Sequence, residues 1–472
     1  MRFLADPGFP AGQPHDGQLG CRCEQRRERA VARGTGTGVR KAHHAHRRVW
    51  ILQRCQQVHR AGVADRGYVT GGEPLPAIVV RVTLSEERRE LLALLTARKA
   101  TTPGQLRFWR LNQADPADPA YSWPWALRLP GPVDESRLRR ALDVVLDRHE
   151  ILTSAYDWDD GTLWQVPAPR PRLQVVGTDV QTALREDNQR PFHLGSEAPL
   201  RVSLLPEDLL LVNIHNIAND GWSMRVFVDE LTRSYRGEEL PEPSLPHHQH
   251  AARLRGWLAS RRAEQEVAYW RRRLAGLEPR NGRSRESTVE RVRIGADVAE
   301  KVRLLGRAAK ATPFMTMFAL FAKLHGERIG SDDVAIGTSV SGRAPDTERT
   351  IGYFVNRLVL RVNTSGEVPD LVRRARTTAV EAFAHATVPF EHLVERLFPA
   401  EYLAAAPLVD VMFVFDTSGP AAVEPEYRTS KFSLVVNVKP DANGYVIEAH
   451  HPKGAPHGVL RDYARLLKGL TT

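Results

Sequence analysis

Cysteine is nearly absent from this chain of 472 residues, and its three cysteines, Cys21, Cys23 and Cys55, all lie near the amino terminus. The remainder of the chain therefore excludes a disulfide framework, a thiolate nucleophile and a cysteine zinc site. A cysteine-free body is typical of a reducing compartment, so the sequence predicts a cytoplasmic location.

Long apolar runs and a secretory signal are also absent. No stretch of about eighteen apolar residues indicates a membrane helix, and residues 1–20 contain three prolines and no apolar core. The net charge of +10 arises mainly in residues 1–66, where 13 Lys and Arg stand against 5 Asp and Glu, so the other 406 residues carry only +2. The sequence predicts neither a nucleic-acid nor a membrane partner.

Residues 1–75 lack apolar periodicity and are rich in Arg, His, Gly and Gln. This composition predicts a disordered basic tail or a mis-assigned translation start, with a polybasic arm as a further alternative. The Gly-Thr repeat at 34–38 follows no strand, which argues against a phosphate-binding loop. A zinc site in this tail is equally disfavoured. Its candidate ligands match no common zinc-finger spacing, and they are Cys21, Cys23, His43 and His44.

After the tail, strand and helix patterns alternate in the order β-α-β-β-α, and this order occurs twice. It predicts an α/β fold (α+β layered) with two similarly built halves. We assign a linker helix to residues 76–100, one half to 101–285 and the other to 286–472. Within the first half, "SMRVFVDELTRSYRG" predicts a helix with Ser223 as its N-cap and Gly237 at its end.

The stretch "HNIANDG", residues 215–221, follows the apolar strand "LLLVNIH" and precedes that helix. A strand end that leads through a loop into a helix directs side chains and N–H groups towards a cleft. Alternation along the strand predicts that His215 and Asn216 point to opposite sides. Asp220, if buried, needs an arginine partner.

This stretch resembles the His-His-x-x-x-Asp-Gly motif of the condensation domains of non-ribosomal peptide synthetases, which belong to the chloramphenicol acetyltransferase-like superfamily. Further segments resemble the motifs of that family in the same order, so the resemblance covers roughly residues 83–472. These segments are "TPGQLRFWRL" (102–111), "RHEILTSAY" (148–156), "IGYFVNRLVLR" (351–361), "HATVPFEHLVE" (385–395) and "APLVDVMFVF" (406–415).

The resemblance implies two chloramphenicol acetyltransferase-like subdomains that form a V-shaped pseudo-dimer with a central tunnel. Phosphopantetheine arms of peptidyl or acyl carrier proteins, or of synthetase modules, bring acyl and aminoacyl thioesters into this tunnel. An amide bond, or in second place an ester, is formed there. The resemblance further implies a monomer that binds no cofactor of its own.

Residue roles are implied in the same way. The catalytic motif positions are His215, Asn216 and Gly221, and Asp220 forms a structural ion pair with Arg343. The residues expected to line the tunnel are Trp222, Asn356 and Arg357. His385 and Glu391 of the segment "HATVPFEHLVE" are expected on a helix in a role that stabilises the fold, and Trp222 and Phe227 also match a core pattern.

The sequence departs from the family at the central position, where Asn216 replaces the second histidine. An amide cannot take up a proton near pH 7, and loss of a general base costs about 10²–10⁴ in rate. If the family histidine mainly positions the amine, asparagine retains part of that role. Arg357 also replaces a threonine, and Thr153 an arginine.

Two hypotheses follow from this departure. The chain is either a condensation enzyme of reduced activity or a non-catalytic platform that recruits tailoring enzymes to a carrier-bound peptide. A channel open at both ends beside Asn216 favours the first hypothesis, and a blocked channel favours the second.

The tail prediction has a direct test. Deletion of residues 1–70 is expected to leave the melting temperature of the remaining chain unchanged, because a segment without apolar periodicity adds nothing to a core. Differential scanning calorimetry of both proteins measures this, and a large drop in melting temperature contradicts the prediction.

Overall fold

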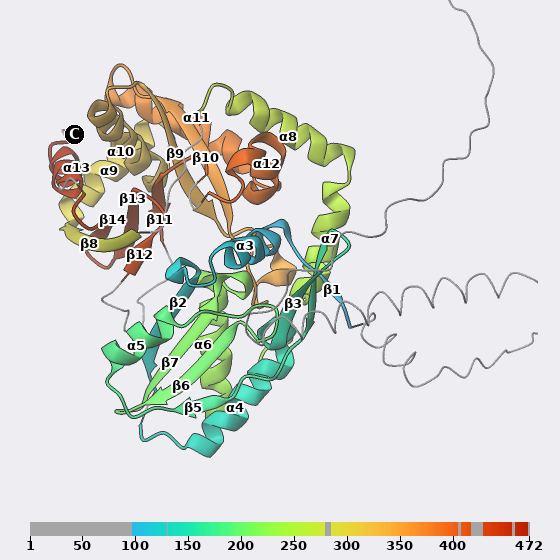
Figure 1. The fold of residues 1–472 in the computed structure, drawn as a ribbon. Coiled ribbons are helices and arrows are strands. Elements are labelled where there is room, and N and C mark those ends of the chain that lie inside the picture. The colour runs from blue at the N-terminus through green and yellow to red at the C-terminus, as the bar shows by residue number, and fades with distance from the viewer. Residues whose placement is uncertain are drawn as a thin grey trace, which may run out of the picture. The chain divides into compact units, whose positions relative to one another are not determined.

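A computed structural model, shown in Figure 1, gives the fold of the chain. The residues that it describes are 97–129, 131–278, 285–404, 407–416, 428–455 and 458–470. The predicted tail, its Gly-Thr repeat and its cysteines lie outside these residues, as does most of the predicted linker helix. The end of that linker, Lys99–Ala100, is strand β1 paired with β4, so the helix prediction is wrong there.

The first half, coloured blue to green in Figure 1, contains a four-stranded sheet in the order β2-β7-β6-β5 and a three-stranded sheet in the order β1-β4-β3. Its strands are β2 (Ser122–Arg128), β3 (Ser154–Asp159), β4 (Thr162–Pro167), β5 (Leu173–Val175), β6 (Leu200–Leu205) and β7 (Leu209–His215). Its helices are α3 (Pro103–Ala114), α4 (Glu135–Arg148), α5 (Val180–Gln189) and α6 (Gly221–Arg236), with 3₁₀ turns η1 (Pro119–Tyr121), η2 (Glu150–Thr153) and η3 (Asn216–Ala218).

Strand β7 is the centre of this half, and all seven of its residues are buried. Alternation along the strand divides them between two cores. Leu210, Val212 and Ile214 pack with α4 and α6 in the main core. Leu209 and Leu211 pack with α5 in a smaller one.

The second half, yellow to red in Figure 1, is built on one seven-stranded sheet in the order β10-β9-β11-β13-β14-β8-β12. Its strands are β8 (Arg285–Ile294), β9 (Asp333–Val340), β10 (Asn356–Asn363), β11 (Val411–Phe415), β12 (Arg428–Ser430), β13 (Leu434–Asp441) and β14 (Gly444–Pro452). Its helices are α9 (Ala296–Ala308), α10 (Pro313–Ile329), α11 (Val368–Ala384), α12 (Phe390–Leu397) and α13 (Val459–Lys468), with turns η4 (Pro345–Thr347) and η5 (Pro399–Glu401).

Helices α7 (His247–Leu258) and α8 (Arg261–Arg273) connect the two halves. Trp270 of α8 is buried in the core of the second half, although it precedes residue 286. Ile351, from the loop before β10, is instead buried in the core of the first half. Each half thus contributes to the core of the other, and the boundary at 285/286 stays a prediction.

Helix α6 begins earlier than predicted. Asp220 is its N-cap, because a carboxylate oxygen of Asp220 accepts a hydrogen bond from the Ser223 N–H group at 2.7 Å. The prediction of Ser223 as N-cap is therefore wrong. Gly237 ends the helix with φ of +75°, as predicted, since this left-handed conformation suits glycine.

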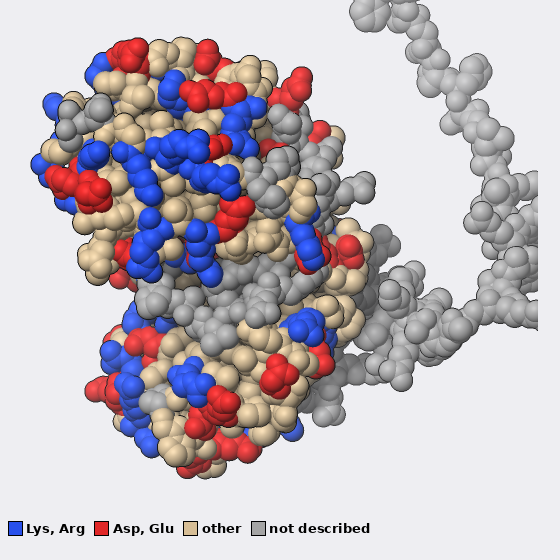
Figure 2. Space-filling model, turned by 90° about the vertical axis from the view of Figure 1, so that its left-hand side faces the viewer, with Lys and Arg blue, Asp and Glu red and all other residues tan. Residues whose placement is uncertain are grey.

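Charge is unevenly distributed over the surface. Figure 2 shows Lys and Arg gathered in a band on one face of the second half. A surface hollow between β8 and α13 is lined by several cations: Arg291, Arg461, Arg465 and Lys468. Within the described part of the chain, no helix is long and apolar enough to cross a membrane.

Two helical glycines give a matched test of the packing between the halves. A Cβ atom at Gly104 in α3 would lie 2.6 Å from the ring of Tyr353, whereas one at Gly256 in α7 meets nothing within 4 Å. Gly104→Ala is expected to lower the free energy of unfolding by about 1–3 kcal/mol. Gly256→Ala is expected to raise it by about 0.5–1 kcal/mol. Urea denaturation measures both, and equal effects would contradict the close packing at Gly104.

Candidate functional site

His215 is the last residue of β7, and its ring is buried with 3% of its surface exposed. The Nδ1 atom accepts a hydrogen bond from the Ile217 N–H group at 3.1 Å, which places the proton of the neutral ring on Nε2. Burial, with smaller effects from Lys431 and Arg201, lowers the pKa of His215 to about 3. His215 is therefore neutral near pH 7 and caps the turn that follows it.

Asn216 is the first residue of that turn, η3, and is half-buried. The strand ends at His215, so the predicted alternation does not extend to Asn216. No described residue forms a hydrogen bond with the side-chain amide of Asn216, although the Asn216 carbonyl accepts one from the Asn219 N–H group. The carboxamide is thus available to a ligand.

Gln105 of α3 holds the same turn from the other side. Its side chain is fully buried and donates hydrogen bonds to the Ile217 carbonyl at 3.2 Å and to the Tyr156 hydroxyl at 3.1 Å. Its Oε1 atom accepts from the Thr102 N–H group, which completes a capping box. The turn that carries Asn216 is therefore fixed on both sides by buried groups.

Asp220 and Arg343 form a buried ion pair between the halves. Arg343 Nη2 lies 2.9 Å from Asp220 Oδ1, and the two side chains are 3% and 2% exposed. Arg343 also donates to the carbonyls of Thr347 and Thr350 at 2.7 Å each. Burial lowers the pKa of Arg343, and the Asp220 carboxylate opposes that shift.

Further hydrogen bonds join the same two segments, including one from Arg343 Nη2 to the Ser223 hydroxyl at 2.8 Å. The second oxygen of Asp220 accepts from the Phe354 N–H group at 3.1 Å. The Ser223 hydroxyl donates to the Gly352 carbonyl at 2.7 Å and accepts from the Gly352 N–H group at 3.0 Å. Ser223 is therefore a clamp between the halves, and the start of α6 is bound to the loop before β10.

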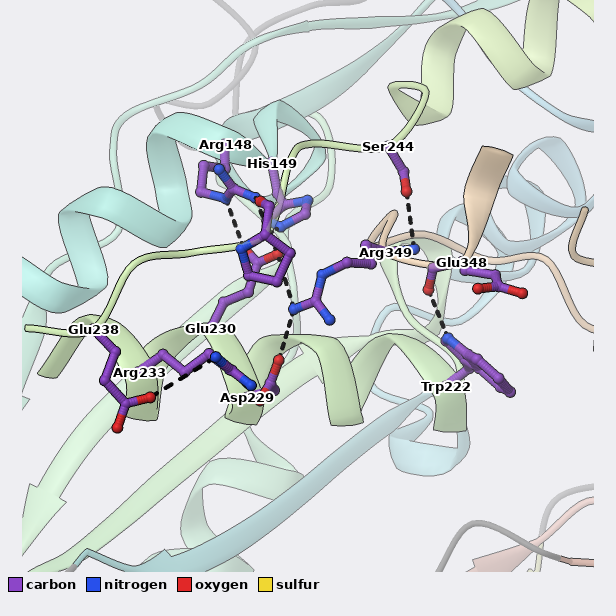
Figure 3. Close-up of polar contacts among 11 residues, drawn as sticks. Arg148, His149, Trp222, Asp229, Glu230, Arg233, Glu238, Ser244, Glu348 and Arg349 are labelled. Carbon is purple, nitrogen blue, oxygen red and sulfur yellow. Dashed lines mark hydrogen bonds and ion pairs between the residues drawn. The ribbon is translucent and has the colours of Figure 1, made fainter. Parts of the chain in front are cut away.

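A second group of ion pairs anchors this loop further along α6, as Figure 3 shows. Arg349 contacts Asp229 at 2.6 Å and Glu230 at 3.5 Å. Glu230 has no exposed surface and also pairs with Arg148 and His149, each at 2.9 Å. Arg148 and His149 of the "RHEILTSAY" motif thus hold Glu230 where it contacts Arg349 in the loop of the second half.

The residues expected to line a tunnel lie in three different settings. The ring N–H of Trp222 donates to the Glu348 carbonyl at 2.6 Å (Figure 3), and Trp222 is 38% exposed, so its prediction as core is wrong. Phe227 is core, with no exposed surface. Asn356 is buried, and its amide faces the turn before α12 rather than open space, bonding to three backbone groups: Ala386 O, Val388 O and Phe390 N.

Arg357 is half-buried and lies over the rings of Phe390, at 4.6 Å, and Phe432, at 5.0 Å. Next to Phe432, Lys431 places its amine 4.4 Å from the ring centroid of Tyr121 and 5.9 Å from that of Phe108. Burial, followed by the charges of Arg357 and Arg107, lowers the pKa of Lys431 to about 7. Two cations of the second half thus lie beside the motif of the first.

The two residues predicted from the segment "HATVPFEHLVE", His385 and Glu391, do not share one helix. His385 caps the end of α11, where it pairs with Glu266 at 2.7 Å and stacks on Tyr269. Glu391 lies in α12, and one of its carboxylate oxygens lies 3.5 Å from the Tyr353 hydroxyl. No group of His, Cys, Asp and Glu suited to a metal occurs among the described residues.

Three residues of the site were not predicted from the sequence: Gln105, Ser223 as a clamp, and Lys431. The Thr-x-x-Gln spacing of a capping box was a signal for Gln105. Lys431 had no such signal, since it comes from a segment remote in sequence that reaches the first half only in the folded chain.

The chain has clear relatives among known proteins. A family model described as "Condensation domain" matches residues 98–450. The chain is 34% identical over 345 residues to one component of the linear gramicidin synthase of Brevibacillus parabrevis, covering 66% of this chain and 4% of that protein. It is 33% identical over 353 residues to phosphinothricin tripeptide synthetase PhsC of Streptomyces viridochromogenes, covering 67% of this chain and 32% of that protein. The chain thus spans a small part of these relatives.

Solved structures of similar fold are also known. The X-domain from teicoplanin biosynthesis is similar with a TM-score of 0.68 and 26% identity, covering 79% of this chain and 94% of that one. A complex of that X-domain with OxyB gives the same TM-score and identity over 85% of this chain and 96% of that one. The condensation domain of the monacolin K polyketide synthase MokA has a TM-score of 0.67 at 22% identity, over 79% of this chain and 96% of that one.

The contribution of the ion pair between the halves to the stability of the fold can be measured. Arg343→Ala is expected to lower the free energy of unfolding by about 3–5 kcal/mol, because it leaves the carboxylate of Asp220 buried without its charge partner. Arg253→Ala is the control, since Arg253 pairs with Asp346 of the same loop but the two side chains are 64% and 51% exposed. Its expected cost is about 0–1 kcal/mol. If urea denaturation gives similar losses in the free energy of unfolding for both variants, the buried pair does not stabilise the fold more than an exposed one.

Proposed function

The chain belongs to the condensation-domain family, whose two-subdomain, chloramphenicol acetyltransferase-like fold it shares, and we propose that it forms an amide bond between carrier-bound substrates at Asn216. The family joins an acyl thioester to an amine. In this chain the acyl and aminoacyl groups arrive on the phosphopantetheine arms of carrier proteins or synthetase modules. The linear gramicidin synthase and phosphinothricin tripeptide synthetase relatives support a place in peptide assembly.

The availability of the Asn216 carboxamide carries this proposal. The residue is half-buried, and its side-chain amide meets no hydrogen-bonding partner among the described residues, while His215, Gln105 and Asp220 fix the backbone around it. A preorganised amide of this kind stabilises charge in a transition state because it needs no rearrangement to do so.

The chemistry that follows uses hydrogen bonds rather than a base. The Asn216 oxygen accepts from the attacking amine, or its NH₂ group donates to the oxyanion of the tetrahedral intermediate. The carbon–nitrogen bond forms, the carbon–sulfur bond breaks, and the amine proton leaves with the thiolate or to water. Neither Asn216 nor the neutral His215 takes up this proton, so the amine must arrive unprotonated.

A second function is favoured by one specific comparison. The X-domain, at 26% identity, occurs in a solved complex with OxyB. Combined with the loss of the motif histidine at Asn216, this likeness supports a platform that binds a tailoring enzyme without transferring an acyl group.

A transfer assay with donor and acceptor carrier proteins of one pathway tests the proposal. Mass spectrometry follows the acyl group on the acceptor for wild type, Asn216→His and Asn216→Ala. Wild type is expected to give product, Asn216→Ala to lower the initial rate by about 10²–10³, and Asn216→His to raise it at least about tenfold by adding a base. Asn443→Ala, in the exposed turn between β13 and β14, is the control and is expected to match wild type.

The outcomes separate the two functions. Product from wild type at a rate that Asn216→Ala does not change removes the proposed role of Asn216. Absence of product from wild type, together with a stable complex with the tailoring enzyme in size-exclusion chromatography, overturns the proposal in favour of the platform.

A further inference from the structure

Arg357 is an enclosed cation without an anionic partner among the described residues. Its guanidinium lies between the faces of Phe390 and Phe432, and its Nη1 atom is buried with no hydrogen bond. Burial lowers its pKa, and the neighbouring Arg107 acts in the same direction. A guanidinium has five N–H donors, and leaving them unpaired in a protein interior is costly.

Lys431 is a second cation in the same situation. Its amine faces the rings of Tyr121 and Phe108, and it forms no ion pair with a described carboxylate. Like Arg357, it is enclosed by protein and yet keeps part of its surface accessible. Both residues are therefore largely enclosed by protein without being cut off from solvent.

Two carboxylates offset the charge of the pair only in part. Glu391 and Asp118 raise the pKa of Lys431, but only as the weaker influences, after burial and the two arginines have lowered it. Glu391 lies 3.5 Å from the Tyr353 hydroxyl and Asp118 caps the η1 turn, and neither forms an ion pair with Arg357 or Lys431. A third cation, Arg107, uses its N–H groups on the carbonyls of Tyr402 and Ala404. An excess of positive charge thus remains at Arg357 and Lys431.

The position of the pair relates it to the motif. The ring of Phe108 lies 6.3 Å from the ring of His215 on one side and 5.9 Å from the Lys431 amine on the other. The charge of Lys431 is also felt at His215, whose pKa it helps to lower. Phe108 therefore lies near both Lys431 and His215, the residue that precedes Asn216.

We propose that Arg357 and Lys431 bind a carboxylate of the substrate, so that the acyl or amine group accepted at Asn216 carries a free acid. A carboxylate accepts two hydrogen bonds from a guanidinium and a third from an ammonium, and it supplies the missing negative charge. In a partly buried site such charge-assisted bonds are stronger than in water. The inference rests on the proposed function, because it assigns a substrate class to the same site.

Binding rather than turnover provides the test, so that the inference and the proposed function fail separately. Two pantetheine analogues with an amide in place of the thioester are compared by calorimetry, one succinyl and one with the terminal carboxylate replaced by a neutral amide. Wild type is expected to bind the succinyl analogue at least about tenfold more tightly. Arg357→Gln and Lys431→Met are each expected to remove most of this preference.

Matched controls remove cations elsewhere. Arg291→Gln and Lys453→Met replace side chains that are 58% and 69% exposed, and both are expected to keep the preference of wild type for the succinyl analogue.

In the absence of ligand, Lys431→Met is expected to raise the melting temperature, because it removes a buried charge without a partner. A lower melting temperature for Lys431→Met would show that Lys431 is already paired and would overturn the proposal.

A second pair of ligands separates the substrate carboxylate from the phosphate of the carrier arm. Butyryl analogues of pantetheine and of phosphopantetheine are compared on the same variants. Unchanged affinity of the variants for both butyryl ligands supports the substrate carboxylate, because neither ligand carries one, and an equal loss for both counts against it. A phosphate-dependent gain in affinity that Arg357→Gln and Lys431→Met abolish assigns the cations to the arm and overturns the proposal, as does equal affinity of wild type for the succinyl and neutral analogues.

Discussion

The buried contact between Asp220 and Arg343 is the constraint on which the site depends. Asp220 caps α6 with one oxygen and binds the backbone of Phe354 with the other, so a single carboxylate fixes the start of a helix and the position of a loop from the other half. Arg343 shares this carboxylate and also orders its own loop through two carbonyls. The geometry around Asn216 thus follows from an interaction that contains no reacting group.

Much of this was predictable because it is local. The apolar strand that ends at His215 and the glycine that ends α6 follow from local patterns, and the resemblance of the ordered motifs implied the family and the two-subdomain fold. All of these predictions are confirmed. What failed depends on contacts between distant segments. Ser223 reads as a helix cap on its own, and only the presence of Gly352 makes it a clamp. Asn356 reads as a site residue until the turn before α12 takes up its amide.

The electrostatics differ from what a motif of two histidines would suggest. His215 is held neutral by burial, and Asn216 has no titratable group, so neither of the two histidine positions of the motif carries a charge near pH 7. Two cations without an ion pair among the described residues, Arg357 of β10 and Lys431 of the segment before β13, lie near this motif. Recognition and orientation of a ligand, rather than proton transfer, are therefore what the side chains around this motif are equipped to provide.

The exchange of core residues between the halves also limits how the domain can be recombined. The loop that carries Arg343, Arg349 and Ile351 is encoded with the second half but completes the core and the charge pairs of the first. A chimaera joined between α8 and β8 would separate Asp220, Ser223 and Glu230 from the residues selected to match them. A junction that transfers residues 343–354 together with the first half keeps these contacts intact, so the natural unit of exchange is discontinuous in sequence.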